Sequence, residues 1–196
     1  MKLVTPEGTA VYPHLNEPDT KFNADGEYST KLSVSSETAN SLIEALESFY
    51  EEAYKDHCKE QNKQKLKKHN HPWTEETDED GNDTGNVVFK FKMKAKTRTG
   101  IVMRPILVDS ETKPLENRIG SGSKLKVSFE ARSWYVPALG VGVTLRLRGV
   151  QVINLVEWTG GSSVESLGFS KEQGFVSETV VESEEFQKET SDNSDF

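Results

Sequence analysis

The sequence contains a single cysteine, Cys58, among its 196 residues. One cysteine excludes an intramolecular disulfide framework and fits a reducing cytoplasm. The chain has no long apolar run, so we expect no membrane-spanning helix. Its first residues, MKLVTPEGT, have only a short apolar patch before Pro6 and are not typical of a signal peptide. Hydrophobic residues make up only 34% of the chain, which predicts that part of it stays outside any core.

The sequence also lacks the residue patterns of an active site or a metal site. Its acidic residues lie in runs, and no nucleophile with a partner base can be identified. His57, Cys58, His69 and His71 are of zinc-binding types, but their spacing matches no familiar zinc pattern and there is no second cysteine. The stretch GSGSK at 120–124 lacks the Gly-Lys-Ser/Thr ending of a phosphate-binding loop. We therefore expect neither an enzyme nor a bound metal or cofactor.

The net charge of −8 is distributed unevenly along the chain. Residues 159–196 hold nine acidic residues and two lysines, whereas residues 84–148 hold 13 basic and four acidic residues. We predict one folded domain over 1–158 and a flexible, disordered acidic tail over 159–196. Residues 1–158 hold 22 basic and 23 acidic residues, so the body is nearly neutral, but its basic stretch is compatible with a polyanionic partner, which the net charge alone would argue against.

Hydrophobic periodicity predicts one helix and several strands. Apolar residues at helical spacing after a serine N-cap predict a long amphipathic helix over about 37–65. The acidic stretch before the next apolar run predicts an exposed, mobile loop over about 69–86. Alternation of apolar and polar residues predicts a β-bulge at Gly149 and strands at 3–12, 28–34, 87–96, 101–108, 124–131 and 143–158.

The most informative strand is VVFKFKMKAK at 87–96. Its apolar residues alternate with Lys90, Lys92, Lys94 and Lys96, so one face can enter a core while four ammonium groups line the other. Alternate residues of a strand lie about 6.6 Å apart, and like charges in such a row repel each other. The row becomes favourable when a polyanion such as a nucleic-acid backbone lies along it. The alternative is that the lysines protect an edge strand from aggregation.

Two further strands carry basic residues at alternate positions, and another basic residue precedes an aromatic pair. Together with the long helix, five or six strands predict a mainly β protein, a small OB-fold-like barrel with an inserted α-helix. Such barrels bind single strands through a cationic groove with aromatic platforms. We expect Trp134 and Tyr135 to stack on bases, with a partly buried core or interface role as the alternative for Trp134. The residues expected to contact phosphates are Lys90, Lys92, Lys94, Lys96, Lys124, Lys126, Arg132, Arg146 and Arg148.

Several stretches resemble one known family. FKFKMKAK at 89–96, GSKLKV at 122–127, ALGVGVTLRL at 138–147 and an acidic tail that ends in Asp195 and Phe196 are similar to the single-stranded DNA-binding proteins of podophages such as bacteriophage T7. The resemblance implies an OB fold with an inserted helix. It also implies a homodimer that coats unwound DNA during phage replication, recombination and repair, and that anneals complementary strands. The expected location is the cytoplasm of the infected bacterial host.

The resemblance further implies that the tail binds the phage DNA polymerase and helicase–primase. From its charge, the tail can also compete with DNA for the cationic groove, because a tethered anion is present at high effective concentration. The alternative is a tail that only keeps the protein soluble. An RNA-binding OB module and a protein-interaction barrel remain open as well, since groove charge and stacking do not distinguish the sugar. The tail residues expected to contact partners are Glu182, Glu184, Glu185, Asp192, Asp195 and Phe196.

Overall fold

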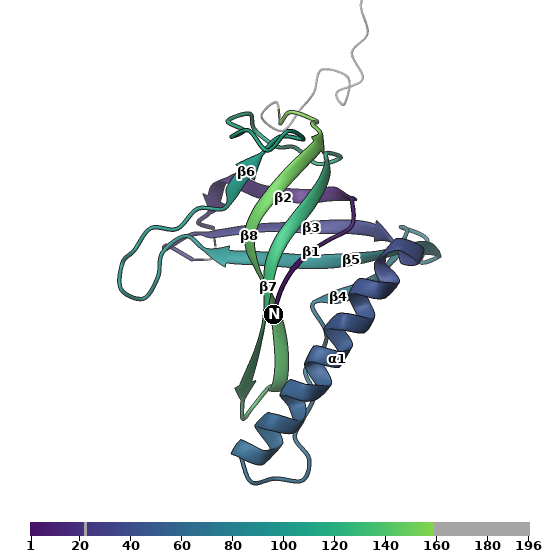
Figure 1. Ribbon diagram of the computed structural model, residues 1–196, viewed down its shortest axis with the longest axis vertical. Helices are drawn as coiled ribbons and strands as arrows, with labels where there is room; N and C mark the ends of the chain where they lie inside the picture. Colours follow the sequence, from purple (N-terminus) through teal and green to yellow (C-terminus); the bar gives the residue numbers. More distant parts are fainter. Residues whose placement is uncertain (22, 159–196) are drawn as a thin grey trace, which may run out of the picture. The chain divides into compact units, whose positions relative to one another are not determined.

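A computed structural model describes residues 1–21 and 23–158, and the predicted acidic tail lies outside these residues. The described chain forms eight strands and one helix (Figure 1). In chain order these are β1 (Lys2–Val4), β2 (Gly8–Asp19), β3 (Glu27–Ser35), α1 (Ser36–Glu60), β4 (Trp73–Thr77), β5 (Asp83–Lys94), β6 (Ile106–Val108), β7 (Lys124–Val136) and β8 (Gly140–Asn154). Within the described ranges, no helix has the length and apolarity needed to cross a membrane.

Five of the strands close a ring. β2 pairs with β3, β3 with β5, β5 with β8, β8 with β7, and β7 with β2. The β5–β8 pairing is parallel and short, with Phe91 opposite Leu145 and Lys92 opposite Arg146. β1 extends the ring at β7, β4 at β5 and β6 at β8. The ring and the single long helix confirm the prediction of a mainly β, OB-like barrel with an inserted helix.

The interior of the ring is filled by the apolar faces that the alternation predicted. On β5, Phe89, Phe91 and Met93 are buried, and the Phe91 ring lies 5.1 Å from the Phe129 ring of β7, measured between centroids. The predicted bulge at Gly149 is also present, because the β7–β8 register shifts between Ser128 and Phe129, the former opposite Gly149. Since the apolar faces point inward, the lysines of β5 stand on the outer surface of the barrel.

Helix α1 begins at a serine N-cap and ends at a left-handed residue. The Ser35 side chain accepts a hydrogen bond from the Thr38 amide, as an N-cap does. The helix ends at Glu60, earlier than the predicted residue 65, because Asn62 adopts a left-handed conformation with φ of 51°. The amides of Asn62 and the following lysine then donate to the last free carbonyls of the helix, as in a Schellman motif.

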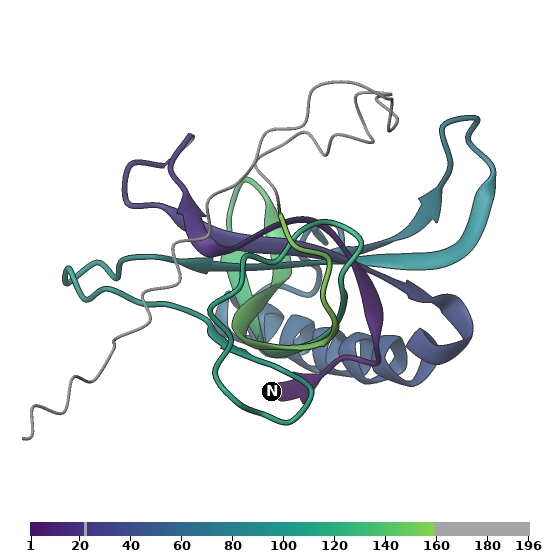
Figure 2. The same ribbon diagram turned by 90° about the horizontal axis from the view of Figure 1, so that it is seen from above.

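The stretch at 69–86, predicted as an exposed mobile loop, contains strand β4. Trp73 pairs with Phe89 of β5 and is buried, which anchors the start of the strand. The hairpin of β4 and β5 projects from one side of the barrel, and the loop that follows β5 projects from the other (Figure 2). That loop also differs from prediction: Pro105 has no amide to pair, and only Ile106–Val108 forms a strand, beside β8.

Candidate nucleic-acid interface

The lysines of β5 form one exposed face that is continuous with its neighbours. Lys90, Lys92 and Lys94 are all exposed, on the opposite face from the buried phenylalanines. Lys92 lies opposite Arg146 of β8 on one side, so the basic residues of two strands meet across the parallel pairing. Directly paired residues in a sheet present their side chains on the same face. The lysine face therefore extends from β5 onto β8.

Where β5 and β8 meet, the surface is hollowed into a groove of about 490 Å³, hereafter the basic groove. Five of the nine residues predicted to contact phosphates line it, and they come from three different parts of the chain. They share the groove with one carboxylate and with uncharged residues from β5, the following loop and β8. The lining residues are Lys92, Lys94, Lys96, Arg132 and Arg146, together with Glu27, Met93, Thr97, Met103 and Thr144.

Two carboxylates hold cations of the basic groove. Glu27 lies 4.0 Å from the Lys92 ammonium, and Glu130 lies 3.1 Å from the Arg132 guanidinium. The hydrogen bond from Arg132 lowers the pKa of Glu130, and the positive charges of Arg132 and Arg148 lower it further. Glu130 is therefore ionised at neutral pH and neutralises part of the charge that Arg132 offers to a ligand.

Trp134 adjoins the basic groove. Its indole lies flat on Gly142 of β8, where a Cβ atom would stand 2.3 Å from the ring, and its Nε1 donates to the Thr144 hydroxyl at 3.0 Å. Since Thr144 lines the groove, the indole stands at the groove's border. Tyr135 points to the other face of β7, where its ring centroid lies 6.2 Å from that of His57 in α1. The structure thus brings Trp134, but not Tyr135, to the basic groove.

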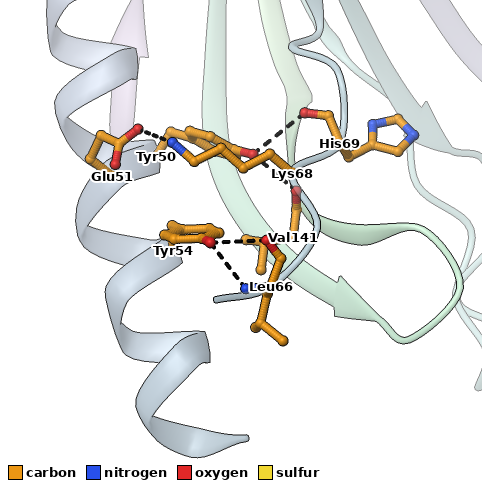
Figure 3. A network of polar contacts seen from close by, with 7 residues as sticks. All are labelled: Tyr50, Glu51, Tyr54, Leu66, Lys68, His69 and Val141. Atoms are coloured by element: carbon orange, nitrogen blue, oxygen red, sulfur yellow. Dashed lines mark hydrogen bonds and ion pairs between the residues drawn. The ribbon is translucent and has the colours of Figure 1, made fainter. Parts of the chain in front are cut away.

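The segment that follows α1 packs against Trp134. The His69 ring meets the indole edge-on, with centroids 5.0 Å apart. The Tyr50 hydroxyl of α1 is shared between the Val141 carbonyl at 3.1 Å and the His69 carbonyl at 3.4 Å (Figure 3). Burial raises the pKa of Tyr50, so its hydroxyl remains a donor at neutral pH. This tyrosine therefore connects the helix, the His69 segment and the start of β8.

A second contact fixes the same segment to the helix. The Tyr54 hydroxyl donates to the Leu66 carbonyl at 2.9 Å and accepts from the Leu66 amide at 3.0 Å (Figure 3). The Lys68 ammonium lies 4.8 Å from the Tyr54 ring centroid and 2.5 Å from a Glu51 oxygen, and the hydrogen bond to Glu51 raises the pKa of Lys68. Lys68 is thus held within the protein by Glu51 and the tyrosine rings.

The other predicted phosphate contacts lie outside the basic groove. Lys126 and Arg148 line a separate hollow of about 310 Å³ beside β6, with apolar neighbours that include Ile106. Lys124 donates to the Thr9 hydroxyl at 2.8 Å, and Lys90 stands on the barrel surface next to β3. The predicted partner residues Glu182, Glu184, Glu185, Asp192, Asp195 and Phe196 lie outside the described residues.

Sequence reasoning missed the groove residues that are not cationic. Thr144 shares the outward face of β8 with Arg146, so the alternation already contained a signal for it. Met103 lies in an irregular loop, and Glu27 comes from a strand that is distant in sequence. No periodic pattern points to either residue.

A closed five-stranded barrel with a basic groove and an indole at its border defines a single-strand-binding barrel of the OB type. A family model described as the single-stranded DNA-binding protein of bacteriophage T7 matches residues 7–155. The chain therefore belongs to this family of phage single-stranded DNA-binding proteins, which are not enzymes. A search of curated proteins finds no match.

Solved structures agree with the family assignment. The crystal structure of gp2.5, a single-stranded DNA-binding protein encoded by bacteriophage T7, is 25% identical, with a TM-score of 0.69 over 91% of this chain and 99% of that chain. The single-stranded DNA-binding protein of bacteriophage Enc34 in complex with single-stranded DNA is 17% identical, with a TM-score of 0.60 over 81% and 89%. A C-terminally truncated form of the Enc34 protein is 16% identical, with a TM-score of 0.59 over 80% of this chain and 87% of that chain. The Enc34 structures support the fold.

Proposed function

We propose that the basic groove is the site where this chain binds single-stranded DNA, without sequence preference, in the cytoplasm of a phage-infected bacterium. The observation that carries the proposal is the convergence of five cationic side chains from β5, β7, β8 and the loop after β5 on one groove, with the half-buried indole of Trp134 at its border. Family membership supports it, and the Enc34 relative is known in complex with single-stranded DNA.

Binding rests on charge and stacking. The groove cations neutralise phosphates and release the counterions condensed on the DNA, which favours binding at low salt. Phosphates compete with Glu27 and Glu130 for the cations that these carboxylates hold. Trp134 stacks on a base at the groove border. Because every nucleotide has a phosphate and a π-face, neither interaction selects a sequence.

Neutralised phosphates also explain a role in strand annealing. Two complementary strands repel each other through their backbones, and a bound protein that screens one backbone lowers this repulsion. The proposed biological role is therefore the coating of unwound DNA and the pairing of complementary strands during phage DNA replication, recombination and repair. From the family resemblance, we also propose that the protein acts as a homodimer.

The acidic tail completes the proposal. Residues 159–196 carry nine acidic residues, and their attachment to the body gives them a high effective concentration at the groove. DNA displaces the tail, which then recruits the phage DNA polymerase and helicase–primase through its carboxylates and the terminal Phe196.

Removing two groove cations tests the proposed site. The double variant Lys92→Gln, Arg146→Gln removes the pair that meets across β5 and β8. We expect weaker binding of fluorescein-labelled oligo(dT) and a log–log salt slope that is less negative by about 1.4, from about −0.7 per phosphate on a single strand. The control Lys113→Gln removes an exposed lysine that is paired with Glu111, outside the groove.

Unchanged affinity and slope in the groove variant would show that DNA binds elsewhere. Competition between oligo(dT) and oligo(rU) on the wild-type chain decides the nature of the nucleic acid. Preferential binding of oligo(rU) would favour an RNA-binding module, and binding of neither at low salt would favour a protein-interaction barrel.

A further inference from the structure

Tyr12 of β2 is the most exposed large hydrophobic residue in the described part of the chain, with 72% of its surface accessible. Its φ is 48°, in the left-handed region that a bulky residue rarely adopts. The next residue, Pro13, has no amide for the ladder, and the β2–β3 register shifts between Val11 and His14. The strand therefore breaks its alternation here and turns the Tyr12 ring outward.

The unusual backbone of Tyr12 is held from a distant part of the chain. Its amide donates to the Ser121 hydroxyl at 3.0 Å, in the loop that leads into β7. The amides of Ala10 and Gly122 also cross-link β2 to this loop. A conformation of this kind costs free energy and persists only when the surroundings fix it, and such sites are enriched at binding surfaces.

The ring stands beside cations that the basic groove does not use. The Lys31 ammonium lies 5.9 Å from the Tyr12 ring centroid. Lys31 pairs directly with Lys90 of β5, and both side chains are exposed on the same face. Lys90 in turn precedes Lys92 by two residues on the lysine face, and Lys92 lines the basic groove. A cationic path therefore runs from the groove to Tyr12.

We infer that Tyr12 is a second base-stacking platform, on which an unpaired DNA base rests while the adjacent phosphates contact Lys31 and Lys90. The inference rests on the proposed function of the basic groove and extends it across β3 to β2. An exposed aromatic face beside an ammonium group is the combination that sequence-tolerant single-strand binding uses. This assigns one function, phosphate contact, to two lysines outside the basic groove. Lys90 does not line that groove, and Lys31 was not predicted from the sequence pattern.

The test compares Tyr12→Ala, Tyr12→Phe and Leu139→Ala in full-length protein, with labelled oligo(dT) and with an oligonucleotide of the same length that carries abasic sites. Leu139 is an exposed apolar residue, 47% accessible, at the β7–β8 turn. We expect Tyr12→Ala to bind oligo(dT) about five- to 150-fold more weakly, the range for loss of one stacked base. Tyr12→Phe and Leu139→Ala should bind as the wild type does.

The abasic oligonucleotide separates stacking from folding. It offers phosphates without bases, so we expect wild type and Tyr12→Ala to bind it equally. The salt slope of Tyr12→Ala should equal that of the wild type, whereas Lys31→Gln should make the slope less negative by about 0.7. Equal binding of oligo(dT) by wild type and Tyr12→Ala would overturn the inference, as would an equal loss on both oligonucleotides. Failure of the wild type to bind oligo(dT) would instead overturn the proposed function itself.

Discussion

Glu130 controls how much of the charge on Arg132 is available to a ligand. The two side chains form an ion pair of 3.1 Å on β7, next to the basic groove. If the groove binds DNA as proposed, the carboxylate also lowers its affinity for phosphate directly, because it is a negative charge beside the groove. Since hydrogen bonding and nearby arginines lower the pKa of Glu130, this charge persists throughout the neutral range.

We therefore predict that Glu130→Gln binds oligo(dT) more tightly than the wild type. Because water and salt screen exposed charges, we expect a gain of at most about fivefold at low salt and a smaller gain at high salt. The control Glu111→Gln removes an exposed carboxylate from an ion pair outside the groove. Anisotropy titrations at low and high salt measure both variants. If the two variants behave alike, Glu130 has no specific influence on the groove.

For single residues, the sequence predicts which face of a strand a side chain occupies better than it predicts which distant residues that side chain meets. The alternation in β5 correctly placed its lysines outward, because the period of a strand is local. The same rule shows why Trp134 and Tyr135 cannot both face the groove, since neighbouring residues of a strand point to opposite faces. The conformation of Tyr12 could not be predicted, because it depends on Ser121, which is 109 positions away.

Among the elements, the β4–β5 hairpin depends on one carboxylate. The Glu76 side chain accepts hydrogen bonds from Ser33 of β3 and from Thr84 and Asn86 of β5. These bonds, led by that from Asn86, outweigh the effect of burial and lower the pKa of Glu76. The charged form is therefore favoured in the folded state relative to the unfolded chain.

A lowered pKa predicts the sign of a pH effect. The stabilisation by Glu76 is fully present above the unfolded pKa of about 4.3 and is lost as the pH falls through the lower pKa of the folded state. We expect Glu76→Gln to lower the Tm at neutral pH, by about 2–4 °C for each 1 kcal/mol lost in a chain of this size. Thermal unfolding of both proteins between neutral pH and pH 3 measures the difference. A difference that does not shrink on acidification would show that the charge of Glu76 is not responsible.

The elements that sequence reasoning misplaced are those with distant partners. The helix was predicted because its apolar face is periodic, but its end depends on the left-handed Asn62, which periodicity does not show. β4 reads WTEET, a polar stretch with no alternating apolar face. It is a strand because Trp73 is buried and because Glu76 bonds to β3, more than 40 residues away.

For the whole molecule, we propose that the basic groove binds single-stranded DNA and that the acidic tail competes for the same groove. A chain that ends at residue 175 loses seven of the nine tail carboxylates. We expect this chain to bind oligo(dT) more tightly than the full-length protein. A full-length variant with those seven residues changed to Gln or Asn should bind as tightly as the shortened chain, because only the charge competes. Weaker or unchanged binding by both would show that the tail does not compete with DNA for the groove.

The most direct measurement is the affinity of the full-length protein for oligo(dT) over a salt series, followed by tryptophan fluorescence. The five cations of the basic groove predict a slope of log affinity against log salt of about −3.5, from about −0.7 per neutralised phosphate on a single strand, and the additional contacts to Lys31 and Lys90 would make it about −4.9. Quenching of tryptophan emission should accompany binding, because Trp134 stands at the groove border. A slope near zero, or no binding at low salt, would contradict the account.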